Sequence, residues 1–323
     1  MRLTVLRWMG WGLLGLAAAV QAAPDQRIAL TIDDLPWQRL DERDDPELAQ
    51  RHAQLLAALK AARVPVVGFV NERKLEQNGQ VQPARVQMLR DWRDAGFELG
   101  NHTYGHVDLH AVGLPAYEQD ILRGERTLRP LLAEQGRAPR WFRHPYLRAG
   151  QSPQERAALA AFLDQHGYRV APVTVDNSEW IWAFAYDKVR DTETDPVARE
   201  ARLRQLRRGY VPYMLNKLDY FQDQSQQLLG RPLAQVWLMH ANALNADCIG
   251  ELIAATQRRG YTFIPLEQAL QDPAYAHADG YNGAGGITWI HRWAMAEGKP
   301  RSFYAGEPGM PYWVMDLAGI EHE

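Results

Sequence analysis

Two adjacent carboxylates follow the first apolar segment of the chain. Asp33 and Asp34 come directly after the run from Ile28 to Ile32. Because side chains alternate in direction along an extended backbone, the two carboxylates should point to different sides. One of them can then bind a cation while its neighbour remains a base. The alternative interpretation is a plain turn, since Asp-Asp before a proline also begins loops.

Two histidines four residues apart, His102 and His106, form a second cluster. At this spacing both imidazoles can share one face of a helical turn and bind one metal ion. Two histidines with one aspartate make a catalytic metal set, because three protein ligands leave positions open for water and substrate. Zn²⁺ suits these donors, and Co²⁺, Ni²⁺ or Fe²⁺ are alternatives. The spacing alone is a weak indication, since such pairs also arise by chance.

Two further polar positions follow short apolar segments. Arg143 comes after the segment that begins at Trp141, and His240 ends the segment that begins at Val236. An arginine near a carboxylate keeps it ionised and holds it in place. A histidine at the end of a strand can deliver a proton near neutral pH. Each residue also has an ordinary interpretation, as a structural arginine and as a polar strand end.

Apolar strands alternate with helical patterns through most of the chain. The predicted strands cover 27–32, 64–70, 97–99, 141–143, 168–175, 236–239 and 261–264, and the predicted helices cover 46–62, 83–94, 115–132, 152–166 and 249–259. Such alternation predicts an α/β fold, here a distorted (β/α) barrel of about seven parallel strands. All four polar positions then lie at the C-terminal ends of strands, where barrels carry their chemistry.

The remaining segments suggest the domain organisation. Residues 181–234 are expected to form a long helical insertion within a catalytic domain that covers 23–271, and 272–323 form a C-terminal extension without clear periodicity. Tryptophans such as Trp182, Trp289 and Trp293 are expected mainly in the core, with stacking on sugars as the alternative.

Composition excludes several classes of protein. The 323 residues carry a net charge of −3 and no long basic run, so nucleic acid is not an expected partner. A single cysteine, Cys248, excludes an internal disulfide and a thiolate metal cluster, and its helical context predicts a buried apolar role. The oligomeric state stays open.

Residues 1–22 have the composition of a secretory signal peptide. Two arginines precede an apolar run from Trp8 to Val20, which small residues close at Ala22. This pattern is typical of a cleaved leader, and the run is shorter than the about 20 residues that span a bilayer. We therefore expect a periplasmic or secreted protein without a stable membrane span. The alternative is an uncleaved anchor.

Five short motifs follow one another between residues 31 and 240. They are Thr31-Ile32-Asp33-Asp34, His102-Thr103-Tyr104-Gly105-His106, Arg143-His144-Pro145-Tyr146, Asp176-Asn177-Ser178-Glu179-Trp180 and Leu238-Met239-His240. In this combination and order the chain resembles the polysaccharide deacetylases with NodB homology, also called carbohydrate esterase family four. The resemblance implies a distorted (β/α) barrel, which agrees with the strand pattern.

The resemblance also implies a role for each matching position. The metal ligands would be Asp34, His102 and His106. Asp33 would be the general base that activates metal-bound water, with Arg143 orienting Asp33 and stabilising its charge. Tyr146 would contact the substrate, and its backbone N–H would stabilise the oxyanion together with the metal.

The later motifs would supply the acid and the walls of the pocket. His240 would protonate the leaving group, and Glu179 would support its protonated form. The family usually has Asp where this chain has Glu179, so Asp176 is the alternative partner of His240. Leu238 and Trp180 would wall a small apolar pocket for the acetyl methyl group.

The implied reaction is removal of N-acetyl or O-acetyl groups from a polysaccharide or oligosaccharide by direct attack of metal-bound water. Two alternatives stay open. The same site could act on a non-sugar amide, since fold and site do not fix the substrate. The chain could also be a glycan-binding protein whose catalysis has lapsed. The features that favour lapse are Glu179, the long insertion, and Leu35 in place of the usual glycine.

Overall fold

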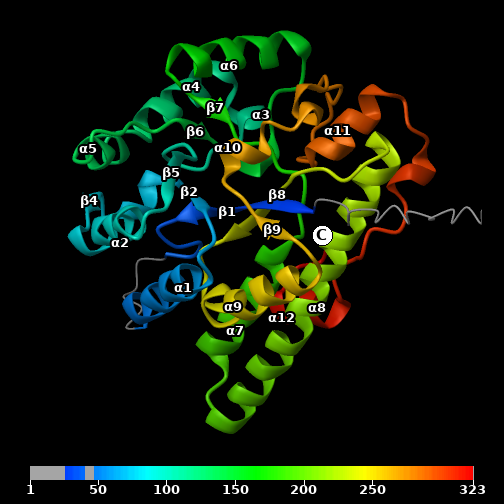
Figure 1. Ribbon diagram of the computed structural model, residues 1–323. Helices are drawn as coiled ribbons and strands as arrows, with labels where there is room; N and C mark the ends of the chain where they lie inside the picture. Colours follow the sequence, from blue (N-terminus) through cyan, green and yellow to red (C-terminus); the bar gives the residue numbers. More distant parts are fainter. Residues whose placement is uncertain (1–25, 41–46, 323) are drawn as a thin grey trace, which may run out of the picture.

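The structure is a computed structural model that describes residues 26–40 and 47–322. Its centre is a seven-stranded sheet (Figure 1). The strands are β1 (Arg27–Leu35), β2 (Val66–Val70), β5 (Glu98–Asn101), β6 (Trp141–Phe142), β7 (Arg169–Val170), β8 (Gln235–His240) and β9 (Thr262–Phe263). The order is β7-β6-β5-β2-β1-β8, and β9 also pairs with β1. Every pairing in this sheet is parallel.

The two ends of the sheet meet through the chain that follows β7. Val175 forms a parallel bridge with Trp237 of β8, and the backbone N–H of Thr174 donates to the carbonyl oxygen of Val236 at 3.0 Å. The sheet is therefore curled toward closure, and the predicted distorted (β/α) barrel of about seven parallel strands is confirmed.

Helices cover the outside of the barrel. Those that follow its strands are α1 (Leu48–Ala62), α2 (Pro83–Asp94), α3 (Leu109–Val112), α4 (Leu114–Arg123), α5 (Leu128–Ala133), α6 (Pro153–Gln165), α9 (Ala243–Arg258) and α10 (Leu266–Ala269). Short 3₁₀ turns form η1 (Glu72–Leu75), η2 (Pro145–Leu147), η3 (Pro273–Ala276) and η4 (Arg301–Tyr304), and a small hairpin joins β3 (Glu76–Gln77) to β4 (Gln80–Val81). Strand β2 is buried throughout, which explains its continuous apolar sequence.

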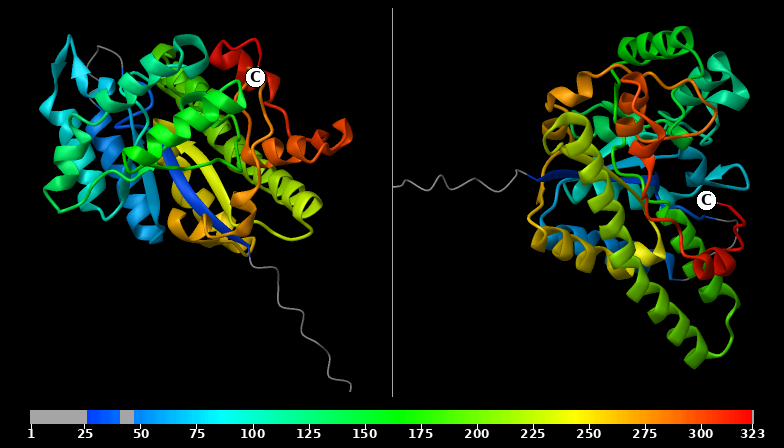
Figure 2. Two further views of the ribbon diagram at one scale, coloured as in Figure 1. Left: turned by 90° about the horizontal axis from the view of Figure 1, so that it is seen from above. Right: turned by 90° about the vertical axis from the view of Figure 1, so that its right-hand side faces the viewer.

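The insertion 181–234 is helical, as predicted. Most of α7 (Glu179–Thr192) and all of α8 (Pro196–Leu229) belong to it. The two helices form a long hairpin whose tip extends beyond the barrel, as the lower part of Figure 1 and the right view of Figure 2 show.

The C-terminal extension packs onto the same body. It contributes α11 (Trp289–Ala296) and α12 (Tyr312–Ala318), and α12 lies against α7 (Figure 1). Ile290, Trp293 and Val314 are buried in the core that the barrel strands and α7–α9 share. The extension was predicted to lack a clear period because its helices are short and separated by glycine and proline.

Two element predictions differ from the structure near the functional clusters. The helix predicted over 115–132 is divided into α4 and α5, with Gly124 after α4. A side chain on Gly124 would come within 2.9 Å of the backbone of Thr103 and Tyr104, so the glycine lets the chain pass close to the histidine loop. The strand predicted over 168–175 is regular only in β7, because the chain then turns from β6 toward β8.

A third difference concerns the start of α9. The sequence predicted a helix from Ile249, whereas the helix begins at Ala243. Asn242 caps it, since the backbone N–H of Asn245 donates to Asn242 Oδ1 at 2.8 Å.

The predicted signal peptide, 1–22, lies outside the described residues. Within the part of the chain that the structure describes, every helix is too short or too polar to cross a bilayer.

Candidate functional site

The end of β1 turns Asp33 and Asp34 away from each other. Asp33 stays in parallel register with His240 of β8, whereas the pairing with β2 shifts between Ile32 and Leu35. Asp34 adopts a left-handed backbone with φ 68°. The two carboxylates therefore face different partners, as the alternation of side chains predicted.

Asp34, His102 and His106 form one cluster of ligand atoms that lie within 4.8 Å of one another. Oδ1 of Asp34 lies 3.8 Å from Nε2 of His102 and 3.7 Å from Nε2 of His106. This buried oxygen has no hydrogen-bond partner among the described residues. Nδ1 of His102 lies 2.8 Å from the carbonyl oxygen of Arg143, which directs Nε2 toward the carboxylate. An unpartnered oxygen that faces two ring nitrogens is a donor set that a divalent cation fits.

The two histidines reach this cluster from a loop, not from a helical turn. Residues 102–107 follow β5 as irregular chain, and Thr103 and His106 have φ values of 64° and 52°. Left-handed residues are costly and cluster at functional sites. Tyr146, with φ 55°, and Asp34 share this property. The spacing of the histidines was therefore informative, but the helical geometry inferred from it was wrong.

Burial and nearby charges set the protonation of the three ligands. Although burial acts to raise it, Lys74 and His106 hold the pKa of Asp34 below its usual range. Burial lowers the pKa of His102 well below the ordinary value, and it also lowers the pKa of His106. At neutral pH the cluster is one carboxylate with two neutral imidazoles, which is the form that binds a metal ion.

Asp33 lies beside the cluster and is held by Arg143. Nη1 of Arg143 donates to Asp33 Oδ2 at 3.3 Å, and Nη2 donates to Thr31 Oγ1 at 2.9 Å. Burial raises the pKa of Asp33 to about 6, and Arg143 opposes that rise. The sequence predicted that Arg143 would stabilise the charge of Asp33, but in the structure burial has the larger effect on the pKa of Asp33. Asp33 is consequently a stronger base than an ordinary aspartate.

His240 lies at the end of β8 with a carboxylate behind it. Nδ1 of His240 is 2.7 Å from Glu179 Oε2, and the side-chain amides of Asn242 and Asn245 donate to Glu179 Oε1 at 2.5 and 2.6 Å. Asp176, the alternative partner, instead accepts a hydrogen bond from the next backbone N–H at 2.7 Å. Although burial lowers it, Glu179 raises the pKa of His240 to about 9.

A cleft of about 600 Å³ brings these groups together. Its lining includes Asp33, Asp34, His102, His106, Tyr146, Asp176, Trp180, Phe184, Leu238, His240 and Gly286. The exposed ring of Tyr146 lies 4.5 Å from the ring of His106, centre to centre. Leu238 and Trp180, the residues predicted to contact an acetyl group, both face this cleft. Arg143 and Glu179 lie behind it, as buried partners of Asp33 and His240.

The structure accommodates the departures from the family pattern. Leu35 is fully buried, and its side chain packs where a Cβ on Gly68 would lie, 2.3 Å from Leu35 Cδ1. The glycine on β2 thus leaves room for a side chain on β1. The insertion supplies Phe184, whose ring is 5.4 Å from that of Trp180, so the insertion forms part of the cleft wall.

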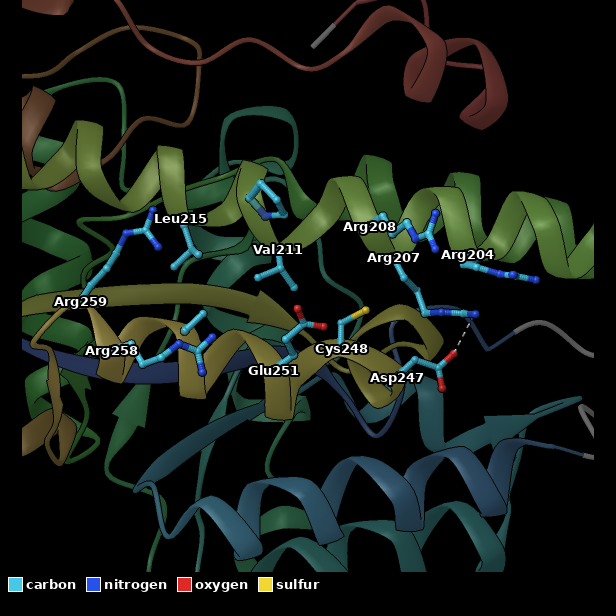
Figure 3. Close-up of a pocket in the computed structure, with 12 residues that line it drawn as sticks. Arg204, Arg207, Arg208, Val211, Leu215, Asp247, Cys248, Glu251, Arg258 and Arg259 are labelled. Carbon is cyan, nitrogen blue, oxygen red and sulfur yellow. Dashed lines mark ion pairs between the residues drawn. The ribbon is translucent and has the colours of Figure 1, made fainter.

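A second cleft, of about 630 Å³, lies between α8 and α9 (Figure 3). Five arginines line it together with Asp247, Glu251 and an apolar floor that includes Cys248. Cys248 is buried, as predicted, and burial raises the pKa of its thiol to about 12. Its described lining contains no histidine. The candidate metal ligands, Asp33 and His240 all belong to the first cleft.

Several contributors to the site escaped the sequence analysis. Lys74 lies 3.0 Å from Asp34 Oδ2, and nothing local in the sequence indicates this contact. Thr31 lies inside the first motif, but its hydrogen bond with Arg143 was not predicted. Asn242 and Asn245 form an Asn-x-x-Asn cap, a signal that could have been read. Of the tryptophans weighed for sugar stacking, Trp182 and Trp293 are buried in the core and Trp289 is half-buried.

Comparison with known proteins finds a sequence similarity to polysaccharide deacetylases that covers the first part of the chain. Residues 21–171 match the sequence model of the polysaccharide deacetylase family. A peptidoglycan-N-acetylglucosamine deacetylase from Bacillus cereus is 28% identical over 153 residues, which cover 47% of this chain and 46% of that protein. The chain thus matches less than half the length of this relative.

A solved structure shows the same fold. A mutant of a carbohydrate esterase family 4 pseudoenzyme from Bacillus anthracis superposes with a TM-score of 0.51 at 17% identity, over 76% of this chain and 67% of that chain. A polysaccharide deacetylase from Bacillus cereus gives a TM-score of 0.48 at 16% identity, over 74% of this chain and 91% of that chain. The resemblance to polysaccharide deacetylases that the motifs indicated is confirmed.

Proposed function

We propose that this protein is a metal-dependent hydrolase that removes acetyl groups from a glycan, in line with the match of residues 21–171 to the polysaccharide deacetylase family. One observation carries the proposal. The candidate ligands Asp34, His102 and His106 share a cleft with an arginine-held carboxylate, Asp33, and a carboxylate-backed histidine, His240.

The donor set suggests the cofactor. Two imidazole nitrogens and one carboxylate oxygen suit Zn²⁺, with Co²⁺ or Ni²⁺ as alternatives. A divalent ion held there would supply Lewis-acid chemistry, polarising an acyl oxygen and lowering the pKa of water.

Asp33 and His240 are placed for opposite proton transfers. With a pKa near 6, the Asp33 carboxylate is ionised at neutral pH and can take the proton of an attacking water. With a pKa near 9, His240 is protonated and can give its proton to the leaving nitrogen or oxygen. Because one pKa lies below neutral pH and the other above it, Asp33 can serve as the base and His240 as the acid at the same pH.

The apolar wall fits a small acyl group. Leu238, Trp180 and Phe184 line the cleft near His240, and a methyl group buried against them contributes about 0.8 kcal/mol of binding. Tyr146 stands exposed at the mouth, where its ring can contact a sugar. We propose an acetylated polysaccharide or oligosaccharide as the substrate and, from the leader-like residues 1–22, a periplasmic or secreted location.

Acetate release from a panel of N- and O-acetylated glycans tests the proposal. Mature protein is assayed after chelation and again after Zn²⁺ or Co²⁺ is restored, with small non-sugar amides as the comparison. We expect release that falls at least about 100-fold on chelation and returns with metal. Release from amides alone would favour the amidase alternative, and metal binding with glycan affinity but no release would favour a lapsed enzyme.

A further inference from the structure

Lys74 places a positive charge against the candidate metal centre. Its Nζ lies 3.0 Å from Asp34 Oδ2 and donates to the carbonyl oxygen of Gln38 at 2.7 Å. The other oxygen of Asp34, Oδ1, faces His102 and His106 at 3.8 and 3.7 Å. The two oxygens of one carboxylate therefore have different neighbours, an ammonium group on one side and the ring nitrogens on the other.

The segment that carries Lys74 also holds the histidine loop. The side-chain amide of Asn71 donates to the carbonyl oxygen of His102, and the backbone N–H of Arg73 donates to that of Tyr104 at 2.9 Å. The Lys74 side chain is itself only 20% exposed. These contacts fix the position of Lys74 relative to all three candidate ligands, whereas an exposed lysine on the surface would be free to move.

This arrangement has two consequences for a bound cation. An ammonium group on Oδ2 leaves Asp34 only Oδ1 for a cation, so the carboxylate would hold the ion through one oxygen. A cation bound to Asp34 would also lie close to the positive charge of Lys74. The two positive charges would repel each other strongly, because the site is largely buried.

We propose that Lys74 is a positioning residue of the metal centre, which restricts Asp34 to one-oxygen binding and weakens the affinity for the cation. A weaker affinity would tie occupancy of the site to the metal supply around the protein. The inference rests on the metal centre of the proposed function, but it requires no particular substrate.

Metal titration of three variants separates the two effects. Lys74→Gln keeps a hydrogen-bond donor and removes the charge, whereas Lys74→Met removes both. Lys60→Met is the matched control, because Lys60 is an exposed lysine near the end of α1. Dissociation constants for Zn²⁺ are measured by competition with a chelator, and the visible absorption of the Co²⁺ form reports the coordination number.

We expect Lys74→Gln and Lys74→Met to bind Zn²⁺ at least about tenfold more tightly than wild type, because the repulsion is gone. The Co²⁺ spectrum should change to that of a higher coordination number only in Lys74→Met, where Asp34 is free to use both oxygens. Lys60→Met should match wild type in both measurements.

Equal or weaker Zn²⁺ binding by both Lys74 variants, with melting temperatures like that of wild type, would overturn the inference. If Lys74→Met fails to fold, the affinity of Lys74→Gln decides the effect of charge. A wild-type protein that binds no metal would give a different result, since it would refute the metal centre of the proposed function itself.

Discussion

At the scale of single residues, the proposed chemistry depends on Asp33 and His240, whose pKa values are both raised above their ordinary range. Burial raises the pKa of Asp33 to about 6. Glu179, acting against burial, raises the pKa of His240 to about 9. Between these values Asp33 is an ionised base and His240 a protonated acid, so deacetylation should rise with pH near 6 and fall near 9.

Asp33→Asn removes the proposed base while leaving the candidate metal ligands in place. We expect turnover to fall by about 10²- to 10⁴-fold, the usual contribution of general base catalysis. Zn²⁺ affinity should stay within about threefold of wild type, because Oδ1 of Asp34 faces the histidines and Asp33 is not among the clustered ligands. Acetate release and metal titration measure the two effects. Asp176→Asn, which alters another carboxylate of the same cleft, is the control and should keep most of the activity. An active Asp33→Asn enzyme would refute the role of the base.

Glu179→Gln should change the alkaline side of the pH profile. A raised pKa means that His240 is protonated below about 9 and loses its proton as the pH rises through that value. When the Glu179 carboxylate, 2.7 Å from His240, is removed, burial still lowers the pKa of His240. The alkaline limb of the profile should therefore shift to lower pH by at least about one unit. The profile of kcat/KM against pH measures this shift. If Asp176→Asn moved the alkaline limb while Glu179→Gln did not, Asp176 would be the partner of His240.

At the scale of elements, local sequence predicted the strands but not the way in which they meet. Apolar runs located β1, β2 and β8 and placed Asp33 and His240 at strand ends, because burial on both faces leaves a clear pattern. The contact between Lys74 and Asp34 joins a 3₁₀ turn to a strand end. No periodicity marks such a contact, since it arises from the packing of the β1 and β2 loops. The family resemblance, not spacing alone, assigned the roles of the site residues.

Another contact between distant elements fixes the loop of Tyr146. Gly286, in the C-terminal extension, lies so close that an added Cβ would be 1.7 Å from the carbonyl oxygen of Tyr146. Arg292 of α11 donates to the carbonyl oxygen of Leu147 at 2.5 Å. The extension thus positions the mouth of the cleft, although the family match ends at residue 171.

Gly286→Ala should therefore displace the Tyr146 loop. We expect kcat/KM for the glycan to fall at least about tenfold, because small misplacements of binding groups cost this much or more. Zn²⁺ affinity should not change, since neither Gly286 nor Tyr146 is among the candidate ligands. Gly309→Ala is the matched control in the same extension, where an added Cβ would meet nothing within 4 Å. Equal kcat/KM in the two variants would show that the close approach has no bearing on the cleft.

At the scale of the whole molecule, the barrel, the insertion and the extension share one core. Trp182 of α7 packs against Trp313 of α12, with ring centres 5.5 Å apart. Gln224 of α8 donates to the carbonyl oxygen of Phe303 at 2.7 Å. The catalytic domain and the extension, which the sequence predicted as separate segments, therefore pack against each other. Each buries apolar surface of the other.

A chain truncated after residue 271 should consequently fail to fold. It loses Ile290, Trp293 and Val314, which are at most 1% exposed, and loss of each large buried side chain costs about 2–5 kcal/mol. Their sum approaches or exceeds the about 5–15 kcal/mol by which native proteins are stable. Circular dichroism and thermal unfolding measure the effect, with removal of 321–323 as the control because it leaves α12 intact. A cooperative melt of the truncated chain near the wild-type temperature would mean that residues 26–271 fold independently. The extension would then act only on the Tyr146 loop, and the loss of kcat/KM in Gly286→Ala would have to occur without a loss of stability.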